Sequence, residues 1–397
     1  MVLLIKKDKN MKIFYIANSR IPTEKAHGVQ ISKMCEAFAN SNIEIELLIP
    51  ARFNHIKESI FEYYNIKNNF FVKRLFTIDA INVIKNKVGF VIQNISFAFS
   101  VLFYLLTIKG NLTVYSRDYF SLFLLSFFKK FNLFYEIHSF PDKQIFFYRF
   151  LLNKIKFIAI SGGLKKELIN SSVKEENILV AHDGVDLDLF NTIDNNKIVL
   201  RKNIDLPQNK KIIAYIGKLT TMGKSKGVEF LIESFSKVLN EIADAYLLIV
   251  GINKEEIGVI QDIFKSFNID QTSYKLVTHV NHLKVIEYEK ASNVLIMNYP
   301  NTKHYQLYMS PLKMFEYMAS SVPIVSSDLP SVREVLNNHN AVLVEPDNVR
   351  ELVNGIKRIL LDNDLSVKIA NKALQDIKQY TWKNRVSNIL EFLNKNR

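Results

Sequence analysis

The segment Ser310–Ala319 combines residue types that suit phosphate binding. Ser310 is a good N-cap and Pro311 suits a first helical turn, so a helix with free backbone N–H groups is predicted to start here. The positive end of such a helix binds phosphate. Glu316 lies about a turn and a half further on, where a carboxylate can accept hydrogen bonds from two ribose hydroxyls. A plain capped helix with a solvated glutamate is the alternative interpretation.

A second segment carries three lysines directly after a predicted strand. The strand ends at Gly217, and Lys218, Lys224 and Lys226 follow before the next predicted helix. Open α/β sheets bind ligands at the carboxyl ends of their strands, so these ammonium groups could neutralise a pyrophosphate. A solvated basic loop is the alternative.

His138 stands at the end of a predicted strand, in the run Tyr135-Glu-Ile-His-Ser139. A lone histidine in such a place often satisfies local hydrogen bonds only, yet its imidazole can also act in chemistry near neutral pH. From the residues alone, both interpretations of His138 stay open.

Two series of alternating strands and helices are predicted to position these residues. In the first series, Gly28 precedes a helix that places Ile31, Met34, Cys35 and Phe38 on one face. Strands are predicted at 11–17, 43–49, 112–115, 133–137, 157–160 and 178–181. This alternation favours a mostly parallel sheet covered by helices.

The polar stretch 191–196 predicts a hinge before the second series. There we expect strands at 212–216, 246–250, 275–277, 294–297 and 324–325, and helices at 228–239, 254–267, 283–290, 311–319 and 332–336. Ser331 and Glu334 have the spacing of a capping box for the last helix. The fold class is therefore α/β with two doubly wound halves, at 11–188 and 197–378, followed by a C-terminal helix at 379–397.

The composition is that of a globular chain with a preference for anionic partners. A length of 397 residues fits two domains, and 52 Lys+Arg against 39 Asp+Glu give a net charge of +13. The single cysteine, Cys35, excludes an internal disulfide framework and fits a reducing compartment. The first ten residues lack the order and length of a signal peptide, so we expect the cytoplasm.

Two apolar stretches, 88–108 and 119–135, stand out in the first half. The first is long enough to span a bilayer, but Gln93, Asn94 and Ser96 interrupt it, so a buried or surface-docked helix is expected. A patch that faces an anionic membrane is the alternative, because phenylalanines beside lysines favour that surface.

Together these segments resemble the family-4 (group 1) retaining glycosyltransferases of the GT-B fold. In that family a basic residue follows the glycine of the first C-domain strand and a Lys-Gly pair lies further on; Lys218 and Lys226 occupy those places. Glu316 matches the second acid of the family's Glu-x7-Glu motif, which holds the donor ribose. The resemblance covers nearly the whole chain and includes the early glycine loop at Gly28, His138, the turn at 158–162 and the segment 181–186.

The resemblance implies two Rossmann-like domains that face a central cleft, with the last helix packed back on the first domain. It implies transfer of a sugar from a UDP- or GDP-sugar to a saccharide or lipid-linked saccharide acceptor, with retention of configuration and without a metal. His138, Lys218 and Lys226 are then expected to act in catalysis, the histidine by orienting or stabilising an oxocarbenium ion. Residues expected to bind the donor are Gly28, Gly217, Tyr308, Ser310, Pro311, Leu312, Lys313 and Glu316.

Three positions depart from the family pattern. Tyr308 stands where the first motif acid is expected, which loosens any inference about the sugar. Lys218 replaces the more usual arginine, which keeps the charge but loses the planar fork. The early loop has one glycine, Gly28, where many relatives have two.

Other function classes remain as alternatives. A protein that binds a nucleotide sugar without turnover fits the same residues. A nucleic-acid-binding protein fits the charge, but the lysines are spread over both halves. A nicotinamide-dependent oxidoreductase lacks its Gly-x-Gly-x-x-Gly fingerprint after the first strand. We expect the protein in the cytoplasm, with a peripheral contact to the inner face of an anionic membrane. Its expected product is a cell-envelope saccharide.

Overall fold

The computed structural model describes residues 11–80, 87–140, 150–221 and 224–396. The chain forms two compact units: unit 1 is Met1–His182 with Trp382–Arg397, and unit 2 is Asp183–Thr381. The boundaries differ from the expected ones at 188, 197 and 378. The reason is local pairing, because the Val185 N–H donates to the Tyr380 carbonyl at 2.9 Å and Val185 forms a parallel bridge with Thr381.

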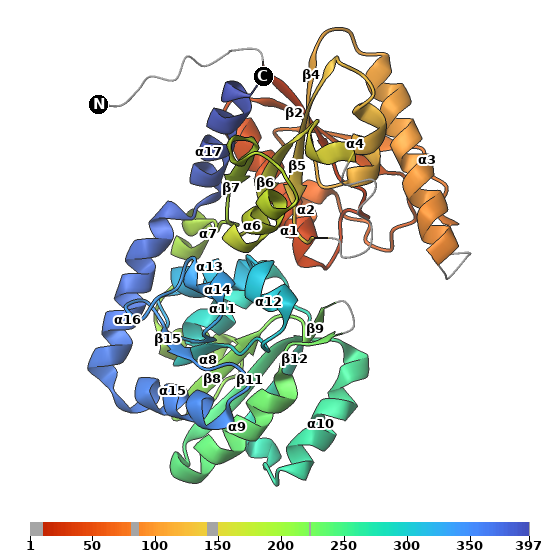
Figure 1. Cartoon of the computed structure of the whole chain (residues 1–397). Helices are drawn as coiled ribbons and strands as arrows, with labels where there is room; N and C mark the ends of the chain where they lie inside the picture. The colour runs from red at the N-terminus through yellow and green to blue at the C-terminus, as the bar shows by residue number, and fades with distance from the viewer. Residues whose placement is uncertain (1–10, 81–86, 141–149, 222–223, 397) are drawn as a thin grey trace. The chain divides into compact units, whose positions relative to one another are not determined.

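Unit 1 is built on one parallel sheet in the order β3-β2-β1-β4-β5-β6-β7 (Figure 1). Strand order reverses between β1 and β4, as in a doubly wound fold. The central strands are apolar runs that are buried on both faces, as parallel sheets require. The strands are β1 Lys12–Ile16, β2 Glu44–Pro50, β3 Phe71–Leu75, β4 Leu112–Ser116, β5 Phe131–Ile137, β6 Lys156–Ala159 and β7 Ile178–Val180.

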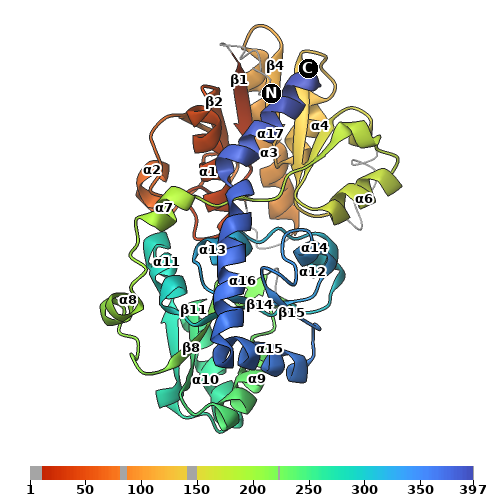
Figure 2. The same ribbon diagram turned by 90° about the vertical axis from the view of Figure 1, so that its left-hand side faces the viewer.

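Helices cover the sheet of unit 1, and the last helix of the chain is one of them. Figure 2 shows α17 lying along α1, and Phe392 of α17 meets Phe134 of β5 with ring centroids 6.2 Å apart. The helices are α1 Ala26–Asn40, α2 Ile60–Tyr63, α3 Lys87–Leu106, α4 Tyr119–Leu125, α6 Gly162–Asn170 and α17 Trp382–Lys395, with a 3₁₀ turn Glu175–Asn177.

Unit 2 repeats the design with a parallel sheet in the order β12-β11-β8-β13-β14-β15 and a separate antiparallel pair, β10-β9. The order again reverses at the first strand of the series, between β8 and β13. These strands are β8 Lys211–Ile216, β9 Thr220–Thr221, β10 Lys224–Ser225, β11 Ala245–Ile252, β12 Tyr274–Thr278, β13 Val294–Met297, β14 Ile324–Ser327 and β15 Val342–Val344.

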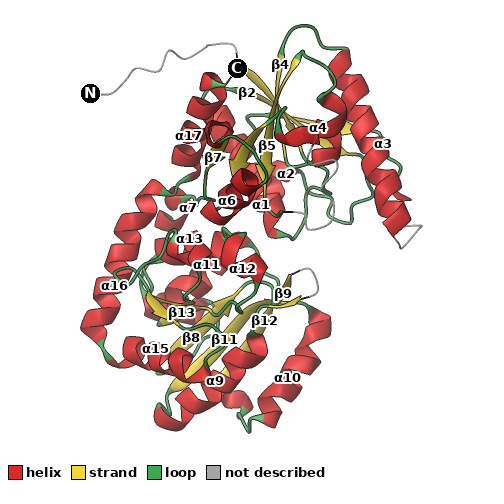
Figure 3. Ribbon diagram, in the orientation of Figure 1, coloured by secondary structure: helices red, strands yellow, loops and turns green. Residues whose placement is uncertain are grey.

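Both faces of the second sheet are covered, as Figure 3 shows. Alternate residues of β8 enter two different cores: Ile212, Ala214 and Ile216 one of them, Ile213 and Tyr215 the other. The helices are α7 Leu187–Asn191, α8 Lys197–Asn203, α9 Val228–Glu241, α10 Ile257–Ser266, α11 His282–Ala291, α12 Lys303–Leu307, α13 Leu312–Ala319, α14 Pro330–Arg333, α15 Val349–Leu361 and α16 Asn363–Asp376, with 3₁₀ turns Lys254–Glu256, Gln271–Ser273 and Ile377–Gln379.

The fold class expected from the sequence is confirmed, while several local predictions are wrong. The expected capping box at Ser331 does not form, since the Ser331 hydroxyl donates to the Tyr305 carbonyl at 2.6 Å and α14 has Leu329 as its uncapped N-cap. The stretch 119–135 divides into α4 and the start of β5. Strands β3 and β15 were missed: β3 is mostly exposed and β15 is only three residues long, so neither has a strong apolar pattern.

Candidate active site

The lysine segment and the helix at 312 meet at the carboxyl edge of the second sheet. Ligands bind where strand order reverses in such a sheet, because the flanking helices diverge there. In unit 2 this place lies just after β8 and β13, at Gly217 and Asn298. Gly217 has φ of +126°, so a residue with a side chain would be strained at this turn.

The short β9–β10 pair carries the chain away from Gly217 and back again. Its return is fixed by the Lys226 N–H, which donates to the Leu219 carbonyl at 2.8 Å. Burial and the nearby charge of Lys218 lower the pKa of Lys226 to about 8. Lys218 and Lys226 therefore lie close enough for their charges to interact, while the side chain of Lys224, the third lysine of the predicted group, lies outside the described part of the structure.

Gly227 ends the return and starts α9. Its φ of +84° makes it a left-handed N-cap, and an added Cβ would lie 2.7 Å from the Asn298 backbone oxygen. The Asn298 side-chain amide donates to the Gly227 carbonyl, which ties the lysine segment to the end of β13. Glycine is required here both for its backbone angle and for this close approach.

Lys313 supplies a third lysine side chain to the same place. Its Nζ lies 3.8 Å from the centroid of the Tyr215 ring, and a Cβ on Gly217 would lie 3.4 Å from that Nζ. The side chain is buried, and among the described residues the Nζ has no hydrogen-bond partner. Burial, and then Lys226, hold the pKa of Lys313 well below its usual value. Without a ligand the uncharged amine is therefore favoured, and a bound anion would favour the ammonium form.

Helix α13 begins one residue later than expected. Pro311 is its N-cap, no side chain caps this end, and Leu312 is the first helical residue. Ser310 does not cap the helix: its hydroxyl oxygen accepts a hydrogen bond from the Asp183 N–H at 2.8 Å, within unit 2. The uncapped N-terminus, with Lys313 in its first turn, still presents positive charge.

Glu316 lies one turn after Lys313 on α13 and has a partner that the sequence did not suggest. His282 Nε2 lies 2.8 Å from Glu316 Oε1, and the two side chains are 29% and 17% exposed. This contact holds the carboxylate in one orientation while leaving part of it accessible. An ionised carboxylate has two acceptor oxygens, so Glu316 can bind hydroxyl groups with its free positions.

A second acid, Glu289 on α11, is fully buried beside these groups. Neither carboxylate oxygen has a hydrogen-bond partner among the described residues. Burial, followed by the charge of Glu316, raises the pKa of Glu289 well above its usual value and favours the protonated form. Tyr308, at the C-cap of α12, is also buried, with Lys303 Nζ 5.7 Å from its ring centroid.

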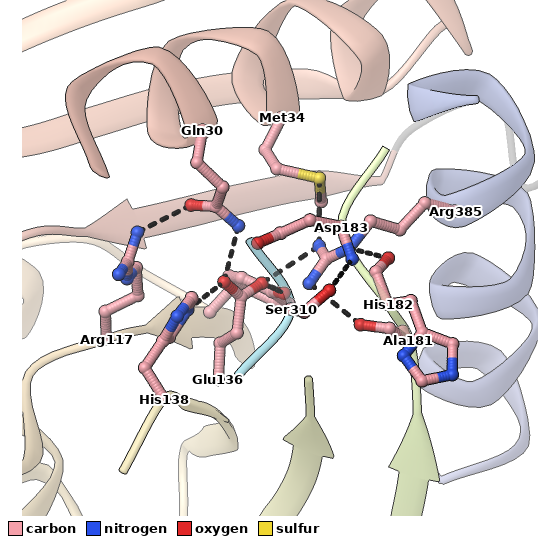
Figure 4. A network of polar contacts seen from close by, with 11 residues as sticks. Gln30, Met34, Arg117, Glu136, His138, Ala181, His182, Asp183, Ser310 and Arg385 are labelled. Carbon is pink, nitrogen blue, oxygen red and sulfur yellow. Dashed lines mark hydrogen bonds and ion pairs between the residues drawn. The ribbon is translucent and has the colours of Figure 1, made fainter. Parts of the chain in front are cut away.

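In unit 1, His138 follows β5 and contacts a buried acid two residues earlier. His138 Nε2 lies 2.6 Å from Glu136 Oε1, as Figure 4 shows. Gln30 donates to the same oxygen at 2.6 Å, and Arg117 donates to Gln30 at 2.6 Å. Tyr115 donates to the other carboxylate oxygen. The acid thus accepts hydrogen bonds from β4, from α1 and from the residue that follows β5.

Arg385 of α17 completes this cluster from the far end of the chain. Its Nη1 lies 3.0 Å from Glu136 Oε2, while its Nε and Nη2 donate to the carbonyls of His182 and Ala181 at 2.8 and 3.2 Å. The guanidinium therefore fixes both the acid and the end of the chain segment that leaves unit 1.

The cluster sets the protonation state of His138. Arg385 holds the pKa of Glu136 well below its usual value despite burial, so Glu136 is ionised and accepts hydrogen bonds only. Burial, and then Arg117, lower the pKa of His138 to about 4. At neutral pH the imidazole is therefore uncharged, with its proton on Nε2 and an acceptor lone pair on Nδ1.

Gly28 does not lie in a loop, contrary to the expectation. It is the third residue of α1, and an added Cβ would lie 2.0 Å from the hydroxyl oxygen of Tyr64. That hydroxyl donates to the Thr23 carbonyl and accepts from the Thr23 N–H, both at 2.8 Å. Gly28 thus makes room for a tyrosine that holds the segment before α1.

The sequence analysis did not identify the residues that orient the candidate site residues. Glu136 could have been identified from the sequence, because a buried acid inside an apolar strand needs hydrogen-bond donors. Glu289 gave none, since it stands between Tyr288 and Lys290 in a helix of mixed polarity. His282, Asn298 and Arg385 are distant in sequence from the groups they contact, so only the fold reveals them.

The chain is similar in sequence and in fold to known glycosyltransferases. The family Glycosyl transferases group 1 matches residues 210–362, which contain Gly217, Lys218, Lys226, Lys313 and Glu316 of the candidate site. An uncharacterized glycosyltransferase of Methanocaldococcus jannaschii is 26% identical over 57% of this chain and 56% of its own length. The capsular polysaccharide biosynthesis glycosyltransferase CapM of Staphylococcus aureus is 23% identical over 59% of this chain. The chain spans only 56% and 61% of the lengths of these two relatives.

A solved structure is similar over nearly the whole chain. HepE of Anabaena, in complex with UDP and glucose, has a TM-score of 0.73 and 16% sequence identity. The match covers 97% of this chain and 100% of that one. At this identity the likeness establishes the fold.

Proposed function

We propose that this chain, which belongs to the group 1 glycosyltransferases and has the GT-B fold, transfers a sugar from a nucleotide diphosphate donor to a saccharide acceptor. The main support is that Lys218, Lys226 and Lys313 lie near the uncapped N-terminus of α13, where strand order reverses in unit 2. Such an arrangement fits the two phosphates of a donor.

The lysines are proposed to act on the leaving group. When the bond from the sugar anomeric carbon to the phosphate oxygen breaks, its electron pair stays on the diphosphate, and the three ammonium groups stabilise that charge. Because the charge grows during bond cleavage, this interaction is stronger in the transition state than in the bound donor. We propose that these groups take the place of a metal ion, so that the reaction needs none.

Glu316 is proposed to hold the donor ribose, oriented by His282. Gly217 leaves room for the phosphates beside the Lys313 ammonium. For His138 we propose that the Nδ1 lone pair orients the donor sugar and that the uncharged ring tolerates positive charge on the anomeric carbon. Ser310, Pro311 and Leu312 position the start of α13, and Tyr308 replaces an acid beside the sugar. The role of Gly28 at the donor stays a prediction.

The acceptor and the stereochemistry belong to the same proposal. We propose retention of configuration, a UDP- or GDP-sugar donor, and a saccharide or lipid-linked saccharide acceptor of the cell envelope. The S. aureus relative is named for capsular polysaccharide biosynthesis, and HepE was solved with UDP and glucose; both support this choice. We place the enzyme in the cytoplasm, with a peripheral contact to the inner face of an anionic membrane.

The test is ligand-induced thermal stabilisation with UDP, GDP, ADP and CMP. A ligand at about a hundred times its dissociation constant stabilises a protein by roughly 2.7 kcal/mol. We expect one diphosphate to raise the melting temperature of the wild type and of Glu391→Ala, which alters an exposed glutamate of unit 1, but not of Glu316→Ala. If no nucleotide stabilises the wild type, the donor site is wrong.

A product assay then separates the enzyme from its alternative. With the stabilising nucleotide known, its sugar conjugates are incubated with saccharide and lipid-linked acceptors, and the anomeric configuration of any product is read by NMR. Binding without product for all acceptors would favour a nucleotide-sugar-binding protein without turnover.

A further inference from the structure

Helix α3 carries apolar side chains on the face that points to solvent. A surface helix usually turns charged and polar residues outward. On α3 six exposed apolar residues recur every three or four positions and form one stripe, and Phe99 and Phe103 stack within it with ring centroids 6.2 Å apart. Phe90, which is 52% exposed near the start of the helix, lies outside this stripe. We call this the α3 stripe; its residues are Val88, Val91, Ile95, Phe99, Phe103 and Leu106, each 37–65% exposed.

The opposite face of α3 is already packed in unit 1. Phe97, Ala98, Val101 and Leu105 are at most 1% exposed, and the helix contacts α4 and β3. Figure 1 shows α3 at the outside of unit 1, beside α4. Val88–Leu106 is long and apolar enough to cross a membrane, but 44% of its apolar window is buried in protein. After the first turn of α3, the stripe is therefore the apolar face that stays exposed to the surroundings.

The chain segment that contains the stripe is basic. Between residues 80 and 135 the only acid is Asp118, which is buried at the N-cap of α4. Lys130 donates to the carbonyls of Leu105 and Ile108 at the end of α3, at 3.2 and 2.6 Å. Lys73 Nζ lies 4.9 Å from the ring centroid of Tyr104, on the same helix, and the Tyr104 hydroxyl donates to Glu46. The basic residues of the segment are Lys87, Lys109, Arg117, Lys129, Lys130 and Lys85, the last of which lies outside the described residues; Arg117 donates to Gln30 in the Glu136 cluster.

We infer that the α3 stripe docks on the surface of an anionic bilayer, with its aromatic rings among the acyl chains and the neighbouring lysines at the headgroups. Apolar side chains flanked by cations fit that partner, since the rings leave water while the cations meet negative charge. A second copy of this chain is a poorer occupant, because a symmetric contact brings the two basic rims together. The inference refines the membrane contact in the proposed function, and its assay uses no sugar donor, so either can fail alone.

The experiment measures binding of the full chain to vesicles by flotation. Vesicles of phosphatidylcholine alone are compared with vesicles that also contain phosphatidylglycerol, at low and at high salt. Three proteins are compared: the wild type; Phe99→Ser with Phe103→Ser; and the control Val259→Ser with Val367→Ser, which removes two apolar residues of unit 2 that are 64% and 50% exposed. Lys109→Glu with Lys129→Glu, both exposed, tests the charge.

We expect the wild type and the control to bind the anionic vesicles, and the phenylalanine pair to bind about tenfold or more weakly. The lysine pair should also lose affinity, and salt should weaken binding of the wild type. Equal binding of all variants, or no binding of the wild type, would overturn the inference. So would a dimer in light scattering that only the phenylalanine pair abolishes, or a wild type that alkaline carbonate cannot extract, since these identify a protein interface or a spanning helix.

Discussion

Arg385 Nη1 and Glu136 Oε2 lie 3.0 Å apart, with side chains that are 2% and 0% exposed, although 249 positions separate them in sequence. The pair joins α17 to β5 inside unit 1. His138 contacts the other oxygen of the same carboxylate. The last helix of the chain therefore helps to fix the geometry and charge of a candidate catalytic residue.

Removal of Arg385 should destabilise unit 1. Breaking a buried ion pair from one side leaves a buried charge and typically costs about 3–5 kcal/mol. We expect Arg385→Met to lower the thermal unfolding midpoint clearly, whereas Lys383→Met, two residues earlier and exposed on the same helix, should leave it nearly unchanged. Differential scanning calorimetry measures the two unfolding midpoints. Equal midpoints for both variants would show that the pair contributes little.

His138 should stay uncharged over the physiological pH range. Its pKa in the folded protein is about 4, against about 6.5 for an unperturbed histidine. As pH falls from 6.5 to 4, the unfolded chain binds this proton first, so stability decreases in that window and is unaffected by His138 above it. His138→Asn should lose this part of the pH dependence, as measured by urea unfolding at several pH values. NMR of the ring that shows protonation near pH 6.5 would contradict the expectation.

Binding of a diphosphate should draw protons onto the lysine cluster. The pKa of Lys226 is about 8 in the empty site, and a nearby dianion favours the ammonium form. At about pH 9, UDP or GDP binding is therefore expected to take up protons, and affinity should fall as pH rises above 8. Calorimetric titration in buffers of different ionisation enthalpy measures the uptake. Lys226→Arg, which stays charged, should take up less; identical uptake would assign the proton elsewhere.

The buried Lys313 side chain should lower the stability of the ligand-free protein and strengthen binding of a nucleoside diphosphate. Its buried Nζ lacks a hydrogen-bond partner among the described residues, a situation that costs roughly 1–3 kcal/mol. We expect Lys313→Met to raise the melting temperature of the ligand-free protein and to reduce stabilisation by the diphosphate at least several-fold. Lys368→Met, at an exposed position of α16, is the control for both measurements. A variant that melts lower and binds normally would show that the ammonium is structural.

The sequence by itself determined the two doubly wound halves and the main phosphate-binding candidates. Continuous apolar runs such as β8 and β11 carry a strong signal, because strands buried on both faces need apolar side chains throughout. Gly217, Lys218 and Lys226 follow the strand at short spacing, so local rules place them at its carboxyl end. Helix α13 was expected from Pro311 and its apolar periodicity, although the cap was assigned wrongly to Ser310.

Only the tertiary structure decided which charges are buried together. Lys313 and Glu289 have ordinary places in their helices, and their burial follows from packing against Tyr215 and other groups of the same unit. Glu136, His138 and Arg385 become one cluster because the sheet places β5 beside β4 and because α17 returns to α1. Hydrogen bonds and charge interactions act over a few ångströms in space, whatever the separation along the chain, so local sequence patterns do not reveal them.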